Sequence, residues 1–247
     1  MPRLRKNRRR DPVHRRLRED LQTRSHQESR KPTTKSEHPT TNNNPTDSDF
    51  LERMFSYFKN ALHSSKPAKD YVARRNLDNS ILEIGYNSGQ FHHGERKTEE
   101  LLKKALEAGL LQDKGLINSR TKEKGYSPFA KWCICFALRN KEHRITSLYF
   151  RSTLHDDPSM AGSTAKHFYL KNRSGIYPGY PKPDTKKLIL TEAIIDCASL
   201  LQIQSIANSY SLMACFGTNG LNEEISQAIK EWLVSEPVEE KEINLLF

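Results

Sequence analysis

The stretch KLILTEAIIDCASLL, residues 187–201, decides how the second half of this chain folds. Its first residues form an apolar run typical of a buried strand, and the rest has the length and composition of an apolar helix. Glu192 stands at the junction between the two. Sheets that alternate with helices bind ligands at the carboxyl ends of their strands, so we expect Glu192 to lie at such an edge.

The segments that follow continue the same alternation. After a helix that we expect to end near Ile203, SLMACFG (211–217) has the composition of a second strand. A helix from about Leu221 to Leu233 and a last strand, INLLF (243–247), complete a β-α-β-α-β series. Strands that alternate with helices in this way predict a parallel sheet.

The residues that precede this series have a different period. KWCICFAL (131–138) and RITSLYFRS (144–152) alternate with a period of two and are separated by a turn-like segment, which predicts an antiparallel hairpin. A short strand, HFYL (167–170), follows. We therefore expect an α+β N-terminal part of helices and antiparallel strands, and after it an incomplete α/β domain with a parallel sheet.

Helix signals occupy the region before the hairpin. Asp49 and Glu52 form a capping-box pattern ahead of an apolar helix. Pro67 suits the first position of a second, short helix. Thr98 is placed to cap a third helix, and Gly109 to end it. These signals give three expected regions, namely a basic arm and linker (1–49), a core subdomain (50–185) and a partial α/β domain (186–247).

Charge is concentrated at the beginning of the chain. The formal net charge is +10, and residues 1–31 hold 12 basic and 4 acidic residues, so most of the excess lies there. Blocks of like charge stay extended unless a polyanion neutralises them. The arm therefore has two interpretations, a contact with nucleic-acid phosphates or a solvated tail. Residues 32–49 are rich in Pro, Thr, Asn and Ser, as linkers are.

Composition favours a cytoplasmic protein. The basic start is not followed by an apolar stretch, and no run reaches the roughly 20 apolar residues of a membrane span, so we expect no membrane association. The cysteines lie inside apolar segments, where a free thiol packs as a small hydrophobic group. They are Cys133, Cys135, Cys197 and Cys215. No zinc is expected, because a second pair of ligands at the right spacing is missing.

His92 and His93 are adjacent in a loop flanked by glycines. Neighbouring side chains in extended backbone point apart, so a shared metal ion is disfavoured.

Together these segments resemble the catalytic core of bacterial DNA primases, and the second part resembles a TOPRIM domain. LEIGYNSGQFHHG followed by LLKKALEAGLL is similar to the family's IleGlyTyr segment and its helix ending in AlaGlyLeu. The hairpin that ends at Arg151, followed by KHFYLKNRSGIYPGY, resembles a family segment with a strand-end Arg and a Lys-Tyr-Leu-Asn motif. LILTEAIIDCASLLQ and FGTNG resemble the TOPRIM Glu motif and the turn after its second strand. The resemblance covers residues 50–247.

The resemblance implies a function and a set of site residues. Glu192 is expected to act as general base or metal-proximal acid, and Asp196 to complete the first acidic motif. Arg151, Lys166 and Lys171 are expected to bind nucleotide or template phosphates. Mg²⁺ or Mn²⁺ is the expected cofactor, and single-stranded DNA and nucleoside triphosphates are the expected partners, with a replicative helicase as a further candidate. The activity is primer synthesis in DNA replication by metal-dependent nucleotidyl transfer.

Three departures from the family modify these expectations. Ala193 stands where glycine usually follows the TOPRIM glutamate, and the first 130 residues contain no cysteine for the family's zinc ribbon. The strand INLLF carries no Asp-x-Asp motif, which holds the metal ions in TOPRIM domains. We therefore expect a chain truncated before that motif, with weak metal affinity and impaired activity by itself.

Other interpretations remain open. Glu192 could satisfy a helix N-terminus, and Arg151 and Lys166 could be surface charges at strand ends. At the level of function, the alternatives are a non-catalytic nucleic-acid-binding replication accessory protein of a mobile element and a TOPRIM nuclease fragment.

Overall fold

The computed structural model describes residues 45–94, 97–117, 119, 122–154, 165–217, 220–235 and 241–246. Residues from Asn43 to Phe247 form one compact unit. The expected basic arm and almost all of the expected linker lie outside the described residues. Within the described ranges, no helix combines the length and apolarity needed to cross a membrane.

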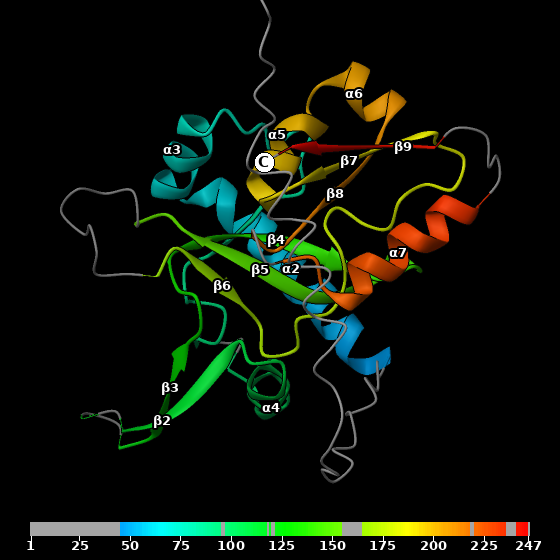
Figure 1. The fold of residues 1–247 in the computed structure, drawn as a ribbon. Coiled ribbons are helices and arrows are strands. Elements are labelled where there is room, and N and C mark those ends of the chain that lie inside the picture. Colours follow the sequence, from blue (N-terminus) through cyan, green and yellow to red (C-terminus); the bar gives the residue numbers. More distant parts are fainter. Residues whose placement is uncertain are drawn as a thin grey trace, which may run out of the picture. The chain divides into compact units, whose positions relative to one another are not determined.

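Most of the helices precede or follow a central run of strands along the chain, and strands and helices alternate only from β7 onward (Figure 1). The helices are α2 (Pro45–Ser64), α3 (Lys66–Arg74), α4 (Glu99–Glu107), α5 (Ile194–Leu201), α6 (Gln204–Ser209) and α7 (Glu223–Val234). The strands are β1 (Gly85–Asn87), β2 (Leu111–Ile117), β3 (Lys124–Pro128), β4 (Cys133–Arg139), β5 (Ile145–Ser152), β6 (His167–Tyr169), β7 (Lys187–Thr191), β8 (Ser211–Ala214) and β9 (Glu242–Leu246).

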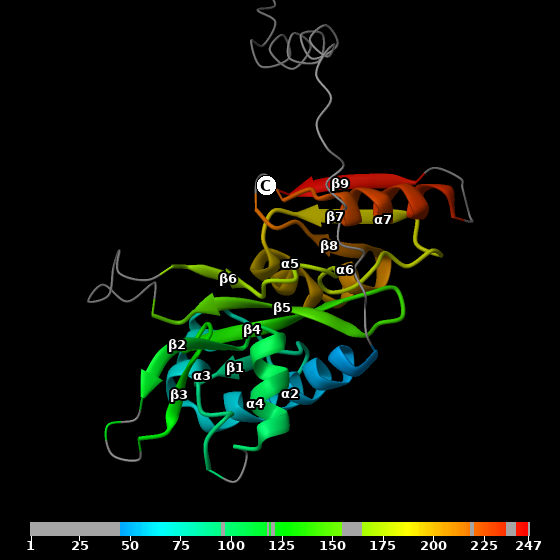
Figure 2. The same cartoon turned by 90° about the horizontal axis from the view of Figure 1, so that it is seen from below.

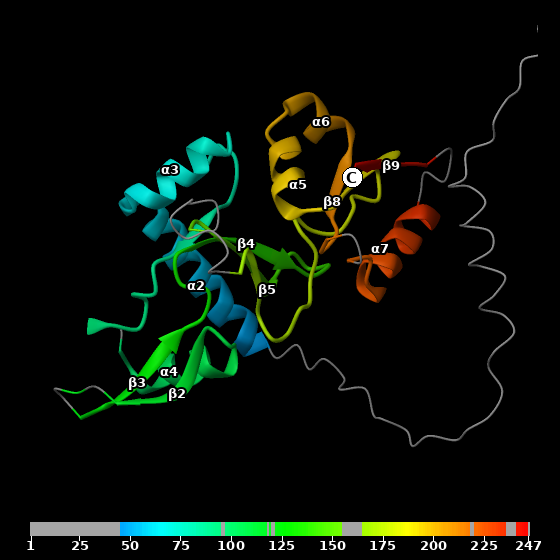
Figure 3. The same cartoon turned by 60° about the vertical axis from the view of Figure 1, so that its left-hand side comes forward.

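The expected parallel sheet is confirmed. Its order is β8-β7-β9, and β7 is parallel to both neighbours. Leu188 and Leu190 belong to a core shared with α7, whereas Ile189 belongs to a core shared with α5. Because successive side chains of a strand point to opposite faces, α5 and α7 cover opposite faces of this sheet, as Figure 3 shows.

The expected antiparallel hairpin is also confirmed. β4 pairs with β5 inside a sheet of order β1-β4-β5-β6. One face, with Cys135 and Phe150, packs on α2, and the opposite face, with Ile134 and Phe136, shares a core with α5. The result is a stack of layers in which α5 lies between the two sheets (Figure 2). All four cysteines are buried and unpaired thiols, as expected.

The pairing of β2 with β3 was not expected from the sequence. Of the seven residues of β2, only Leu111 is buried. A strand exposed on both faces carries no alternation of apolar and polar residues, so the periodicity that identified the other strands is missing here.

The first helix begins earlier than the capping-box pattern indicated. α2 starts at Pro45, so Asp49 lies inside the helix and is not its N-cap. Asp49 forms an ion pair with Arg144, and a Glu52 carboxylate oxygen accepts a hydrogen bond of 3.0 Å from the backbone N–H of Ile145. The two acids therefore connect α2 to the turn between β4 and β5. Thr98 caps α4 as expected and accepts from the Leu101 N–H at 3.2 Å, and Gly109 follows its end with a positive φ. Pro67 lies in the first turn of α3 but is its second residue, because Lys66 begins the helix.

Close packing against α2 and β4 explains why Gly85, the first residue of β1, is a glycine. A Cβ atom built at this position would lie 2.7 Å from the Cys135 sulfur and 2.8 Å from the Phe58 Cβ. Real side chains do not approach so closely, so any larger residue would push α2 away from the sheet. This contact fixes the distance between α2 and β1.

His92 is buried. The expectation that the side chains of His92 and His93 point apart was wrong. The rings of His92 and His93 lie 4.1 Å apart between centroids. His92 is 5% exposed, and its Nδ1 atom has no hydrogen-bond partner within the described part of the chain. Burial, followed by the nearby charges of His93 and Lys97, lowers the pKa of His92 from 6.5 to about 4.

This shift predicts a pH-dependent stability. Between pH 4 and 6.5 the unfolded chain binds a proton at His92 that the folded chain does not, so the free energy of unfolding should rise with pH in this window. The contribution is fully present above pH 6.5 and is lost as the pH falls to about 4. After an allowance for solvent screening it amounts to about 2 kcal/mol.

Urea unfolding at several pH values tests this prediction. His92→Phe should remove most of the change in unfolding free energy between pH 4.5 and 7, whereas the exposed His63→Phe should leave it unaltered. An unchanged pH slope in the His92 variant would contradict the assignment.

Candidate active site

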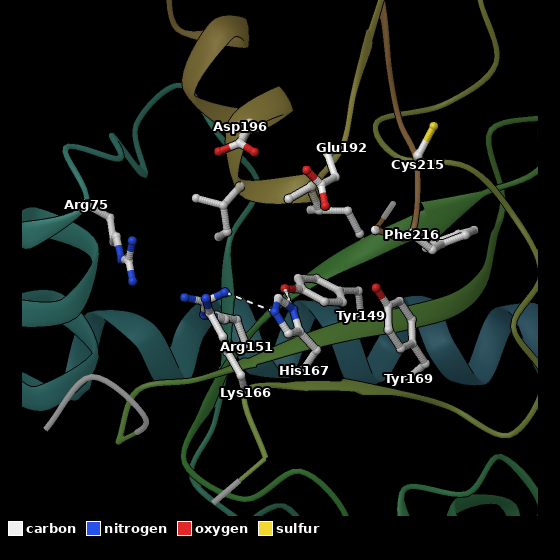
Figure 4. A pocket seen from close by; sticks show the side chains of 14 residues that line it. Arg75, Tyr149, Arg151, Lys166, His167, Tyr169, Glu192, Asp196, Cys215 and Phe216 are labelled. Atoms are coloured by element: carbon white, nitrogen blue, oxygen red, sulfur yellow. Dashed lines mark hydrogen bonds between the residues drawn. The ribbon is translucent and has the colours of Figure 1, made fainter. Parts of the chain in front are cut away.

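A pocket of about 440 Å³ lies at the carboxyl end of β7, where the sequence placed Glu192. Its walls come from β5, β6, the start of α5, the segment after β8, and the end of α3. The lining residues are Arg75, Tyr149, Arg151, Lys166, His167, Tyr169, Glu192, Ala193, Ile194, Ile195, Asp196, Cys215, Phe216 and Gly217. Figure 4 shows the acidic side chains on one side of this pocket and the basic side chains of β5 and β6 on the other.

The backbone around Glu192 is anchored to both neighbouring strands. Its N–H donates to the carbonyl of Leu246 at 3.2 Å, and its carbonyl accepts from the N–H of Gly217 at 3.0 Å. The Cys215 N–H donates to the Thr191 carbonyl at 2.8 Å. These bonds fix the turn from β7 into α5, so the position of the Glu192 side chain is set by the sheet.

Asp196 lies in the first turn of α5, at the rim of the same pocket. The N-cap of this helix is Ala193, whose side chain offers no oxygen to the first N–H groups. A helix start without a side-chain cap presents N–H donors and the positive end of the helix dipole. The rim therefore combines carboxylates, which suit a cation, with backbone donors, which suit an anion.

Arg151 forms the opposite wall and is almost fully buried, with 5% of its surface exposed. Its Nε donates to the hydroxyl of Tyr71 at 3.1 Å, and its Nη1 lies 3.3 Å from Nε2 of His167. A buried guanidinium is held in one orientation by such bonds. The guanidinium charge therefore keeps a fixed position beside the pocket, unlike that of a flexible arginine at the surface.

Arginine only donates, so its contact fixes the proton position on His167. Nε2 must accept from Arg151, which places the imidazole proton on Nδ1. Nδ1 then donates to the hydroxyl oxygen of Tyr149 at 2.7 Å. Burial, and next the proximity of Tyr169, raises the pKa of Tyr149, so its hydroxyl keeps its proton. That proton is available as a hydrogen-bond donor on the wall of the pocket.

Two further cations contribute to the basic wall. Lys166 immediately precedes β6, and Arg75 caps the end of α3. The Arg75 guanidinium lies 5.6 Å from the ring centre of Tyr71, the same residue that holds Arg151. Together these side chains give the pocket a positive wall that faces Glu192 and Asp196 (Figure 4).

Aromatic rings form one end of the pocket. Tyr169 lies 5.1 Å from Tyr149 and 5.4 Å from Phe216 between ring centroids. The Arg173 guanidinium lies 3.9 Å from the centre of the Tyr169 ring. The contacts connect β5 and β6 to the segment after β8.

The structure therefore brings together four of the five site residues expected from the sequence. Lys171 is the exception, because it is exposed and lines a separate pocket with Leu51 and Asn172. Sequence reasoning missed His167, although it pairs directly with Arg151 across β5 and β6. It also missed Tyr71 and Arg75, and no spacing in the sequence connects α3 with β5.

Comparison with solved structures identifies the fold. The RNA polymerase domain of Mycobacterium tuberculosis primase DnaG, in complex with a double-stranded DNA oligomer with a 6-nucleotide overhang, matches with a TM-score of 0.61 at 15% identity. The match covers 82% of this chain and 64% of that chain. The chain has the fold of a primase catalytic core.

Two further primase structures agree with this assignment. A DnaG primase catalytic domain bound to single-stranded DNA has a TM-score of 0.55 at 14% identity, over 81% of this chain and 62% of that one. A DNA primase domain from Pseudomonas aeruginosa has a TM-score of 0.54 at 22% identity, over 74% and 58%. The chain thus spans about three fifths of the length of these primase structures.

The likeness is one of fold. No protein-family model matches the sequence, and no curated protein sequence matches it. The resemblance noted in the sequence is confirmed at that level, because the primase-like fold contains both the antiparallel and the parallel sheet that the motifs predicted.

Proposed function

We propose that the pocket binds nucleoside triphosphates and single-stranded DNA, and that it belongs to a primase-type nucleotidyl transferase. The observation that carries the proposal is the pairing of Glu192 and Asp196 with Arg151, Lys166 and Arg75 around one cavity. Nucleotidyl transfer needs carboxylates for divalent ions and fixed cations for phosphates at the same place. The primases of similar fold, some of which were solved with DNA, support the same interpretation.

The residues of the pocket fit a divalent cation. Mg²⁺ binds to oxygen ligands and is commonly held by one or two carboxylates together with substrate phosphates. Glu192 and Asp196 supply two carboxylates at the rim. Within the described ranges, no cluster of three or more acidic, histidine or cysteine side chains could hold a metal ion. We therefore expect metal affinity to depend strongly on bound triphosphate.

In this mechanism the basic wall binds phosphates, and the acidic wall serves the metal ion or the attacking hydroxyl. Arg151 and Lys166 bind and orient phosphate oxygens, and the N–H groups at the start of α5 add donors. Glu192 would hold the divalent ion together with Asp196, or it would accept the proton of the attacking hydroxyl. When bound, the divalent ion supplies neutralisation of phosphate charge. Primer synthesis needs acidic ligands in addition to this pair, because two metal ions require more oxygen atoms.

Triphosphate binding in the presence and absence of Mg²⁺, measured by calorimetry, tests this function. Glu192→Gln should remove the Mg²⁺-dependent part of the affinity, about tenfold, because one anionic ligand becomes neutral. Lys166→Ala should weaken binding about fivefold with and without metal. Lys171→Ala is the matched control, since the structure places this lysine outside the pocket, and its affinity should equal that of the wild type.

Two outcomes would overturn the proposal. One is a triphosphate affinity of the wild-type protein that is the same with and without Mg²⁺. The other is primer synthesis that, after fusion of a segment carrying an Asp-x-Asp motif, proceeds equally well in the Glu192→Gln variant.

Deleting the basic arm distinguishes the primase-type function from the alternative, a non-catalytic accessory protein that binds DNA through the arm. Removing residues 1–31 should reduce DNA affinity at low salt but leave triphosphate binding intact, because phosphate contacts of such an arm are sequence-independent and sensitive to salt. Complete loss of DNA binding on deletion would favour the accessory function over a template site in the core.

A further inference from the structure

Trp132 is presented to solvent in a conformation that tryptophan rarely adopts. The residue is 45% exposed, and its φ angle is +60°. Ala130, two residues earlier, also has a positive φ, of +47°. A bulky residue in this left-handed region is strained, and such strain is retained where the surrounding structure enforces it and where function requires it.

Backbone contacts enforce this conformation. The Trp132 N–H donates to the Asn87 carbonyl at 2.7 Å, and the Trp132 carbonyl accepts from the backbone N–H and the hydroxyl of Thr153 at 3.1 and 2.7 Å. The buried Asn87 amide donates to the carbonyls of Phe129 and Ala130 at 2.8 and 3.3 Å. None of these bonds uses the indole, so the loop positions the ring without depending on it.

A cation lies against the exposed ring. The Lys131 ammonium is 4.2 Å from the Trp132 ring centre. A Cβ atom built on Gly89 would lie 2.8 Å from the Cγ of Lys131. The aliphatic part of the lysine side chain therefore packs on this glycine. A cation on one face of an indole leaves the opposite face for stacking.

The ring borders a pocket of about 540 Å³ that also includes Tyr57, Tyr86, Ser88 and the start of α3. The other end of α3 carries Arg75, which lines the candidate active site. Nine helical residues rise about 13 Å, so the two pockets lie a few nucleotides apart along this helix. The basic residues of α3 and its cap are Lys66, Lys69, Arg74 and Arg75, and of these Lys66 forms an ion pair of 2.6 Å with Asp70.

We propose that Trp132 is a stacking platform for an unpaired base of single-stranded nucleic acid that runs along α3 to the active site. The inference rests on the proposed function and assigns it an additional binding residue. Aromatic rings accept any base because every base has a π-face, and neighbouring lysine and arginine side chains bind the phosphates. An exposed indole together with Lys69, Arg74 and Arg75 on the helix that leads to the candidate active site is the combination that binds single-stranded nucleic acid, so this is the occupant that the observations favour.

The chain contains only two tryptophans, which permits a direct measurement. Trp232 is 3% exposed and its indole N–H donates to the Lys182 carbonyl at 3.1 Å, so iodide should quench Trp132 and spare Trp232. Addition of a thymidine oligomer at about 0.2 M salt, which suppresses the contribution of the arm, should quench Trp132 fluorescence and protect it from iodide. Trp132→Phe should abolish both signals.

Trp132→Gly separates binding from folding. Glycine adopts a positive φ without strain, so the backbone bonds should persist and the thermal midpoint should stay within about 3 °C of the wild type. Affinity for the oligomer should fall at least about fivefold, the lower range for loss of one stacked base. Trp132→Tyr should restore most of it. An oligomer with abasic sites should bind the wild type and the glycine variant equally, because it offers phosphates and no bases.

The outcomes distinguish this inference from the proposed function. If the wild type binds the oligomer and the glycine variant binds it equally well, the platform is refuted and the proposed function stands. A loss that is equal for normal and abasic oligomers would also refute stacking. If the wild type binds no single-stranded DNA at any salt concentration, both proposals fail.

Discussion

Replacing Arg151 with lysine is expected to weaken binding of nucleoside triphosphates about 100-fold. Lysine keeps the charge but loses the planar fork of donors. Each hydrogen bond to a charged group contributes roughly 1.5–3 kcal/mol, so the loss of one bidentate phosphate contact accounts for a change of this size. The measurement is triphosphate affinity by calorimetry, alongside the thermal midpoint.

The network around Arg151 makes the effect specific. Tyr71 and His167 hold the guanidinium at 3.1 and 3.3 Å, and a lysine ammonium at this buried position cannot keep both partners and a phosphate. Tyr71→Phe preserves Arg151 and removes one of its anchors, so it should cost about fivefold in affinity with little change in stability. This variant tests positioning separately from charge.

Arg144→Lys is the matched control for the arginine substitution. Arg144 is more exposed than Arg151 and forms its ion pair with Asp49 away from the pocket, so triphosphate affinity should be unchanged. Wild-type affinity in the Arg151→Lys variant, with an unchanged thermal midpoint, would exclude Arg151 from phosphate binding.

Replacing Phe58 with alanine should destabilise the fold by about 3–5 kcal/mol, the usual cost of a large cavity in a core. Phe58 is fully buried and contacts Phe91 and Phe150 edge to face, with centroid distances of 5.7 and 6.4 Å. Its Cβ also lies against Gly85, where the backbones leave no room for relaxation. The cavity should therefore remain largely open.

Urea unfolding measures this effect. Phe58→Leu should cost less than the alanine variant, and it provides the measurement if Phe58→Ala does not fold. Ile81→Ala should change the free energy of unfolding by less than about 0.5 kcal/mol, because Ile81 is 58% exposed. A cost below about 1 kcal/mol for Phe58→Ala would show that α2 is not anchored by this residue.

The fold was predictable where burial leaves a periodic pattern. β4, β5, β7 and β8 are buried on both faces, so they stand out in the sequence as short apolar runs, and β9 is apolar although it is only partly buried. β2 has no such pattern because its residues after Leu111 are exposed. The Asp49 and Glu52 pattern was misleading because both acids bond to a distant turn, which no local motif encodes.

The site was predictable to the extent that its residues lie at strand ends. Glu192 follows β7 and Arg151 lies near the end of β5, so each was identifiable as a strand-end residue. The two strands belong to different sheets, and the core shared by these sheets and α5 brings their ends together. Lys171 was misplaced because β6 ends at Tyr169 and Leu170 turns into the core, which directs the following residue away from the pocket. Tyr71 and Arg75 depend on how α3 packs, and this is decided by tertiary contacts.

The core between the two sheets has a consequence for how the pocket works. Ile134 and Tyr149 of the antiparallel sheet and Ile194 and Cys197 of α5 belong to one continuous hydrophobic cluster beneath both walls. The acidic and basic walls therefore cannot swing apart as a hinge without exposing that cluster to water. Folding itself sets the distance between the acidic wall and the basic wall. A ligand that contacts both walls therefore binds without a large rearrangement of the protein. Substitutions in the part of this layer that does not line the pocket, such as Ile134 and Cys197, should consequently alter the spacing between the two walls.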